Sequence, residues 1–161
     1  MSYTESRQAT AAHRLIKQLL KAILEASGSA SRVCFGVIGE VEPRQQAVIE
    51  WIASSRSHQK PREGGQPIAD WDAFLPALSE GLCAMLPRPN ALTRVCFQAF
   101  SATSMLVCPA TDEHGRLAGA LFILWDRNEA PPQAEPLGRL MAAGKRVGGQ
   151  IAAVQALPIP F

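Results

Sequence analysis

Two apolar runs held apart by a short polar stretch constrain most strongly what this chain can fold into. They lie in LVCPATDEHGRLAGALFILWD, residues 106–126, on either side of the polar stretch Asp112–Arg116. Polar residues with a glycine supply a turn, and runs of β-branched, aromatic and small apolar residues pair as strands, so this segment predicts a β-hairpin. The second run shows almost no polar alternation, which predicts a strand buried on both faces.

Both ends of the chain carry a helical pattern. Apolar side chains recur at three-and-four spacing in residues 4–26 and again in residues 135–157, so each helix has one apolar face to cover. Gly28 is available as a left-handed cap after the first helix. The apolar positions are Leu15, Ile16, Leu19, Leu20, Ile23 and Leu24 in the first helix, and Leu137, Leu140, Met141, Val147, Ile151 and Val154 in the last.

The segment after the first helix predicts two strands and a helical insert. RVCFGVIGE, residues 32–40, and AVIEWIASS, residues 47–55, are joined by a short polar link and predict an antiparallel pair. A long loop follows, and residues 68–87 then predict a helical insert, with Asp70 able to cap its start and Pro76 interrupting it.

The next run, ALTRVCFQAF at residues 91–100, predicts a third strand, and the hairpin supplies two more. The order helix, two strands, insert, three strands, helix predicts an α+β fold. We expect a central antiparallel sheet of five to six strands over residues 31–125. The two terminal helices would cover one face and the insert the other, since both helices have an apolar stripe to bury. The hairpin would be the central pair, with the last helix packed over it.

Composition excludes several classes of protein. Sixteen basic residues are nearly matched by fourteen acidic ones and are spread along the chain, which argues against a nucleic-acid surface. No run approaches eighteen apolar residues, so we expect no membrane span. The first twelve residues are polar and lack the apolar core of a signal peptide, so we expect a cytoplasmic protein. A length of 161 residues suits a single domain, residues 1–161.

The cysteines predict neither a metal site nor a disulfide framework. Cys34, Cys83, Cys96 and Cys108 are far apart in the sequence and form no CxxC pair. Zinc sites and small disulfide scaffolds use closely spaced cysteines. Three of the four lie in apolar runs, so we expect buried, reduced thiols. The sequence also lacks a GxSxG motif and a phosphate loop in the context of a strand and helix, so no catalytic residue is predicted.

The last third of the chain resembles the GAF domains, small sensor modules of bacterial signalling proteins and cyclic-nucleotide phosphodiesterases. A proline near a strand end, a turn with glycine, a GxLxL-like strand and a helix with QIA carry the resemblance. The matching residues are Pro109, Gly115, Gly119, Leu121, Ile123, Leu137, Ala142, Gln150, Ile151, Ala152 and Ala153. The resemblance implies a GAF/PAS-like sheet, a pocket between sheet and insert, and terminal helices that lie side by side and often form a dimer bundle.

That family includes modules that bind cyclic nucleotides, bilins, haem, iron or small metabolites. The sequence carries no Asn-Lys-Phe-Asp-Glu series of the cyclic-nucleotide class, and no cysteine precedes a histidine as in the bilin-attaching class. The cofactor is therefore left unknown. The resemblance implies ligand-binding candidates at Cys34, Phe35, Trp51, His58, Trp71, Phe74, Phe97 and Cys108. It implies helix-interface candidates at Leu15, Leu19, Ile23, Leu140, Val147, Ile151 and Val154.

These observations leave three hypotheses. The first is a cytoplasmic sensor domain, a homodimer that binds a small molecule and relays its state through the terminal helices to an output domain or partner protein. The second is a ligand-free dimerisation scaffold of the same fold. The third is an enzyme like the free methionine sulfoxide reductases, which needs two cysteines converging at a pocket; Cys83 and Cys108 are the pair to test. A cavity with converging polar groups would favour sensing, and one filled by Trp and Phe would favour scaffolding.

Overall fold

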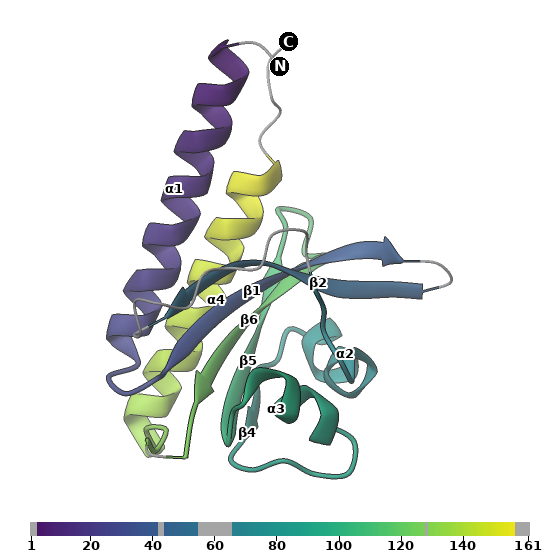
Figure 1. Cartoon of the computed structure of the whole chain (residues 1–161), viewed down its shortest axis with the longest axis vertical. Helices are drawn as coiled ribbons and strands as arrows, with labels where there is room; N and C mark the ends of the chain where they lie inside the picture. The colour runs from purple at the N-terminus through teal and green to yellow at the C-terminus, as the bar shows by residue number, and fades with distance from the viewer. Residues whose placement is uncertain (1–2, 42–43, 55–65, 128, 157–161) are drawn as a thin grey trace.

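A computed structural model gives the arrangement of the chain and describes residues 3–41, 44–54, 66–127 and 129–156 (Figure 1). The elements are α1 (Tyr3–Ala26), β1 (Arg32–Val41), β2 (Arg44–Ser54), β3 (Gln66–Pro67), α2 (Trp71–Ser79), β4 (Ala84–Leu86), α3 (Arg94–Phe100), β5 (Ser104–Thr111), β6 (Leu117–Trp125) and α4 (Ala134–Ala156). None of the described helices is both long and apolar enough to cross a membrane.

The described strands form one antiparallel sheet in the order β3-β2-β1-β6-β5-β4. This confirms the predicted α+β fold and the predicted antiparallel pairing of the first two strands. The hairpin is formed by β5 and β6, but it is not the central pair. The centre of the sheet is β1 beside β6, because the short strand β4 adds to the outer edge of β5.

The hairpin turn is fixed by one carboxylate. Asp112 Oδ1 accepts the backbone N–H groups of His114 and Arg116, each at 2.9 Å, and Gly115 takes a φ of 76°. The N–H donors, that of Arg116 first, lower the pKa of the Asp112 carboxyl. Residues of β6 from Gly119 to Trp125 are buried, as predicted for a strand covered on both faces.

The terminal helices lie side by side on one face of the sheet, and α4 runs across β5 and β6 (Figure 1). This confirms the predicted layering. Gly28 ends α1 with a φ of 76°, as the sequence predicts. The core beneath these helices is built from apolar side chains of both helices and of the sheet: Ile16, Leu20, Ile23, Leu140, Val147, Ile151, Phe35, Leu106, Leu121 and Trp125.

The other face carries α2 and α3 (Figure 1). Aromatic rings fill the space beneath them. Phe122 of β6 meets Phe74 edge-on, with ring centroids 5.9 Å apart, and lies 5.7 Å from Phe100. Offset and edge-on contacts of this kind add to the burial of the rings themselves. The sheet therefore separates two apolar cores, one on each face.

The predicted strand at residues 91–100 is wrong, because this segment contains the helix α3. Asn90 Oδ1 accepts the N–H groups of Leu92 and Thr93, at 2.8 and 3.1 Å, and this local turn leads the chain into the helix. Asp70 Oδ2 then accepts the backbone N–H of Cys96 at 2.9 Å. The same carboxylate was predicted to cap α2. Asp70 stands at the N-cap position of α2 but makes no cap bond there.

The predicted helical insert at residues 68–87 ends early. Gly81, with φ 77°, donates to the Leu78 carbonyl, and Leu82 donates to the Ala77 carbonyl. These are the two bonds of a Schellman cap, which ends α2 after Ser79. Residues 84–86 then form the edge strand β4 instead of more helix.

Candidate functional site

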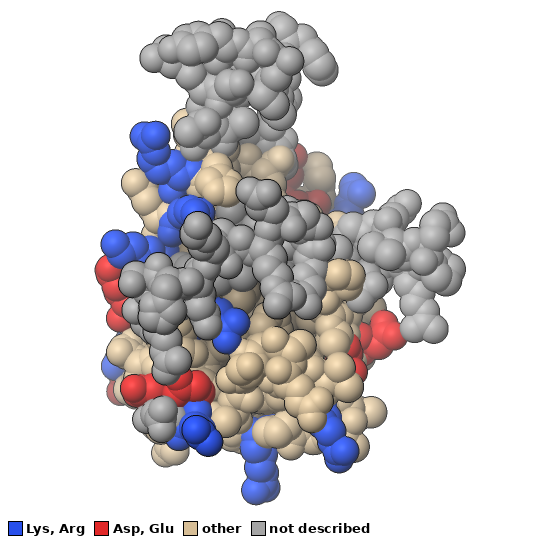
Figure 2. All heavy atoms as spheres, in the orientation of Figure 1, with Lys and Arg blue, Asp and Glu red and all other residues tan. Residues whose placement is uncertain are grey.

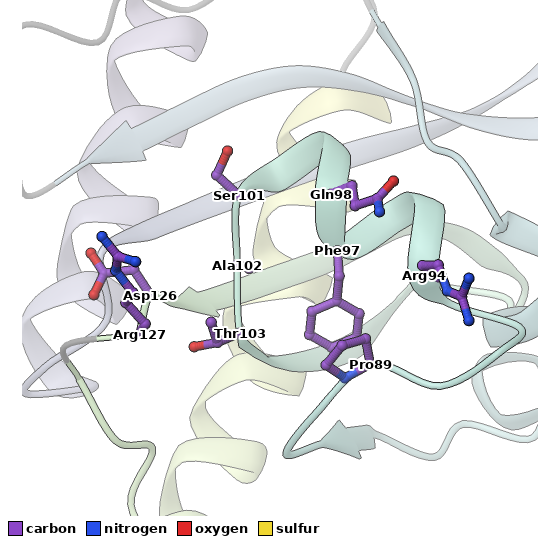
Figure 3. Close-up of a pocket in the computed structure, with 9 residues that line it drawn as sticks. All are labelled: Pro89, Arg94, Phe97, Gln98, Ser101, Ala102, Thr103, Asp126 and Arg127. Atoms are coloured by element: carbon purple, nitrogen blue, oxygen red, sulfur yellow. The ribbon is translucent and has the colours of Figure 1, made fainter.

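A cavity of about 510 Å³ opens between α3 and the ends of β5 and β6 (Figure 3). It lies on the face of the sheet that carries α2 and α3, because α3 supplies one wall and contributes Phe97 and Phe100 to the core of that face. The volume falls within the range of small-molecule pockets in proteins. Its lining residues are Pro89, Arg94, Phe97, Gln98, Ser101, Ala102, Thr103, Asp126 and Arg127.

The cavity joins an apolar wall to polar groups. Figure 3 shows the ring of Phe97 directed towards Pro89, while Asp126 and Arg127 lie together on the opposite side. Gln98 and Arg94 project from the same helix, α3 (Figure 3). The site can therefore hold a molecule with a flat apolar part between two groups of hydrogen-bonding side chains, each of which includes a guanidinium suited to an acid group.

Hydrogen bonds hold the cavity walls to the sheet. The N–H of Thr103 donates to the Trp125 carbonyl at 2.8 Å, which fixes the loop after α3 against the end of β6. The guanidinium of Arg32 donates to the carbonyl of Phe100, so the start of β1 holds the C-terminal end of α3. The walls thus belong to three separate segments that the sheet brings together.

The sheet divides the predicted ligand-binding residues between its two faces. Cys34, Trp71, Phe74 and Phe97 share the core beneath α2 and α3. Phe35 and Cys108 lie in the core beneath the terminal helices, so they cannot line the same cavity. Neighbouring residues of one strand point to opposite faces, so the adjacent residues Cys34 and Phe35 lie in different cores. Of the predicted residues whose side chains the structure describes, only Phe97 lines this cavity.

Two of the predicted ligand residues have no described side chain. The backbone of Trp51 pairs with Phe35 in the β1–β2 register, and its side chain is outside the described part of the structure. His58 lies outside the described residues altogether. Among the described residues, no three His, Cys, Asp or Glu side chains are grouped as metal ligands.

Most of the cavity residues were missed by sequence reasoning. Arg94, Gln98 and Ser101 have helical spacing of four and three residues, which places them on one face of α3. The predicted strand at residues 91–100 ended before Ser101, so the three residues were not recognised as one face. Thr93, Cys96, Phe97 and Phe100 form the adjoining, buried face at the same kind of spacing, and Phe97 also lines the cavity. That pattern was the available signal for a helix.

Buried thiols differ between the two faces. Burial raises the pKa of Cys34 to about 12, and burial followed by the nearby Asp70 raises that of Cys96 to about 12. Cys83 and Cys108 lie on the other face, where Cys108 belongs to the core beneath the terminal helices and Cys83 packs against that core. This pair lies beneath α4, on the face of the sheet opposite the described cavity.

The predicted helix-interface residues also divide into two groups. Ile23, Leu140, Val147 and Ile151 are buried in the core of their own chain and are unavailable to a second one. Leu15 is 43% exposed, and Leu19 and Val154 are partly exposed. Of the predicted interface residues, Leu15, Leu19 and Val154 are therefore the ones that a second chain could contact.

The charges on the visible face are mixed. In Figure 2 the Lys and Arg side chains lie mostly around the margin of this face, with acidic side chains among them, and uncharged residues occupy its lower centre. A nucleic-acid-binding surface needs basic side chains gathered in one patch. The described residues visible in Figure 2 do not form such a patch.

The fold is that of a GAF domain, as comparison with solved structures shows. The blue-light-absorbing PixJ GAF domain from Thermosynechococcus elongatus matches with a TM-score of 0.66 at 12% identity, over 94% of this chain and 89% of that one. A GAF domain/HD domain protein from Geobacter sulfurreducens matches with a TM-score of 0.68 at 13% identity, over 91% and 95%. A domain of a two-component sensor histidine kinase protein from Sinorhizobium meliloti matches with 0.60 at 15% identity, over 89% and 93%.

No family model matches the sequence, and no curated protein matches it significantly. The likeness to known proteins is therefore one of fold. The structural neighbours are mostly sensory or regulatory domains of signalling proteins.

Proposed function

We propose that this chain is a sensor domain that binds a small polar molecule in the cavity between α3 and the end of β6. The observation that carries the proposal is a cavity that Arg127, Asp126 and Ser101 line together with Phe97 and Pro89, which belong to its apolar wall. A filled pocket was expected for a scaffold, and a cavity with converging polar groups for a sensor. The neighbouring GAF domains of signalling proteins support the same class.

The ligand class follows from the lining. Arg94 and Arg127 suit a carboxylate or phosphate, and the ring of Phe97 offers a flat surface for an aromatic or heterocyclic group. A small aromatic acid or a nucleotide fragment satisfies both requirements. Binding energy comes from burial of the ring, and orientation comes from the charged end.

The relay would use the terminal helices. The cavity walls are hydrogen-bonded to the ends of β1 and β6, and α4 packs directly on β5 and β6. A ligand that binds one arrangement of these strands more tightly shifts the population of α4 positions. We propose a homodimer that uses Leu15, Leu19 and Val154, and a single domain over residues 1–161 acting in the cytoplasm. The free cysteines suit a reducing compartment.

The experiment begins with mass spectrometry of the protein purified under native conditions, which would show a retained molecule directly. A thermal-shift screen of aromatic acids and nucleotides follows on the wild type and on Arg127→Ala. Arg116→Ala is the matched control, since Arg116 is an exposed arginine of the hairpin, away from the cavity.

The proposal expects a bound or stabilising compound for the wild type and for Arg116→Ala, with affinity about tenfold lower for Arg127→Ala, the cost of one charge-assisted contact. A wild type that retains nothing and responds to no compound in the screen would support the ligand-free scaffold. A compound whose affinity is unchanged in Arg127→Ala would place the ligand elsewhere in the fold.

A further inference from the structure

Two thiols meet at the outer edge of the sheet, on the face away from the cavity. β4 pairs with β5 so that Ala84 lies opposite Val107. Cys83 directly precedes β4, and this register continued by one residue would set it opposite Cys108. Their side chains lie on one face, because Cys108 belongs to the core beneath the terminal helices and Cys83 packs against that core. Each thiol shifts the pKa of the other, as expected for neighbouring groups.

This placement matches what a disulfide requires. Residues directly opposite each other in an antiparallel pair have Cα atoms about 4.5–5.5 Å apart. Disulfides span Cα separations of about 4.4–6.8 Å. Cys83 and Cys108 can therefore be joined without moving the strands apart. Cys34 and Cys96, the remaining thiols, lie in the core of the opposite face.

Cys83 and Cys108 differ in exposure and in the direction of their pKa shifts. Cys108 is 0% exposed, whereas Cys83 is only partly buried and lies next to the exposed residue Leu82. The neighbouring Cys108 thiol lowers the pKa of Cys83, and Lys145 on α4 acts in the same direction. The pKa of Cys108 is raised by the neighbouring Cys83 thiol and by burial. Because thiolate character and access both favour oxidation, Cys83 is the thiol that reacts first.

We propose that Cys83 and Cys108 are a redox modification site that a hydroperoxide converts to a disulfide beneath α4. The Cys83 thiolate attacks the peroxide, so that an S–O bond forms, the O–O bond breaks, and the alcohol or water leaves with a proton. The Cys108 sulfur then attacks the Cys83 sulfenic acid. The S–S bond forms, and the hydroxyl leaves as water with the Cys108 proton. Two thiols lose two electrons, and the peroxide gains them; a dithiol reverses the change by exchange.

Oxidation of this pair would change the contacts between α4 and the sheet. The Cys83 thiol donates to the Met141 carbonyl at 3.9 Å, and the Cys108 sulfur lies beneath Gly144. A disulfide removes the first contact and redirects the sulfur in the second. Oxidation at this site would thus alter the packing of α4 without a ligand in the cavity.

The test uses the wild-type chain. It is reduced, exposed to hydrogen peroxide, blocked with N-ethylmaleimide, and digested without reductant for mass spectrometry. Trypsin cuts after Arg94 and chymotrypsin after Phe97 and Phe100, so Cys83, Cys96 and Cys108 fall on separate peptides. We expect a Cys83–Cys108 linked peptide that dithiothreitol abolishes. Cys34 and Cys96 serve as the internal control and should stay unlinked. A folded protein in which Cys83 and Cys108 remain unlinked would overturn the proposal, as would a link between Cys34 and Cys96.

Two variants test the order of the steps. In Cys108→Ala the sulfenic acid of Cys83 has no partner, so dimedone should label Cys83 and no other residue. In Cys83→Ser the peroxide should leave Cys108 unmodified, because the accessible thiol is gone. Dimedone labelling of Cys108 in Cys83→Ser, at the extent seen for Cys83 in Cys108→Ala, would contradict the assigned roles.

Discussion

Gly144 of α4 lies directly over the sulfur of Cys108 in β5. A β-carbon added at Gly144 would come within 2.6 Å of Cys108 Sγ and 3.3 Å of Cys108 Cβ. Contacts this short force a neighbour to move. The close approach of α4 to the sheet therefore depends on the absence of a side chain at this position.

The first prediction compares two glycines of the same helix. Gly144→Ala should lower the free energy of unfolding by about 1–3 kcal/mol, the usual cost of overpacking. Gly149→Ala is the control, because its β-carbon would meet nothing closer than the Thr111 carbonyl at 3.8 Å. It should stabilise the protein by about 0.5–1 kcal/mol through helix propensity. Urea denaturation followed by circular dichroism measures both values.

A double variant separates the contact from other effects of Gly144→Ala. Cys108→Ala removes the sulfur, so Gly144→Ala should cost less in that background, and a double-mutant cycle gives the coupling between the positions. Additive effects of the two substitutions would mean that the helix is not held against this sulfur.

The helices and the hairpin were predictable because their patterns are long or locally complete. α1 and α4 each repeat an apolar stripe over several turns, and the hairpin turn carries Asp112 and Gly115 at the positions that its hydrogen bonds and positive φ demand. A pattern with several repeats distinguishes helical from strand spacing. These elements agree with the sequence in kind and nearly in their bounds.

The middle of the chain was less predictable because its elements are short. α3 has seven residues, and its run of Val95, Cys96 and Phe97 has the composition of a strand. The helical spacing of its buried residues was present but spans only two turns. The cavity was missed with it, because Arg94, Gln98 and Ser101 share a face only in a helix. Asp126 and Arg127 reach the same cavity through sheet pairing, which local sequence cannot show.

The second prediction concerns alkaline pH. In the unfolded chain Cys34 and Cys96 ionise near a pKa of about 8.5, but in the folded chain their pKa values are raised to about 12. The unfolded state therefore releases protons that the folded state keeps, so stability is full below about pH 8.5 and falls as pH rises towards 12. Each thiol contributes a slope of up to about 1.4 kcal/mol per pH unit.

Urea denaturation at several values of pH between 9 and 11 measures this slope. Cys96→Ala should show a shallower fall than the wild type. Val95→Ala is the matched control, because Val95 neighbours Cys96 on α3 and is 54% exposed. Equal slopes for all three proteins would show that Cys96 is not shielded from ionisation.

The third prediction concerns the indole of Trp71. Its Nε1–H is buried and has no acceptor among the described residues. Trp71→Phe removes an unsatisfied donor and keeps most of the ring, so the free energy of unfolding should change by less than about 1 kcal/mol. Trp71→Ala should lower it by about 3–5 kcal/mol through loss of the buried ring. A large loss in Trp71→Phe would mean that the indole N–H has an acceptor in the folded protein.

The last prediction tests the proposed dimer. Leu15 is 43% exposed on α1, beside the partly exposed Leu19, whereas Ile23 on the same stripe is 2% exposed and belongs to the core. Leu15→Glu should therefore weaken association by about tenfold or more, because a charge replaces apolar contact area, while the monomer stays folded. Leu92→Glu is the control: Leu92 is 72% exposed and precedes α3, on the far side of the sheet from α1. Sedimentation equilibrium should show a dimer for the wild type and for Leu92→Glu. If Leu15→Glu associates as strongly as Leu92→Glu, the dimer does not use this stripe of α1.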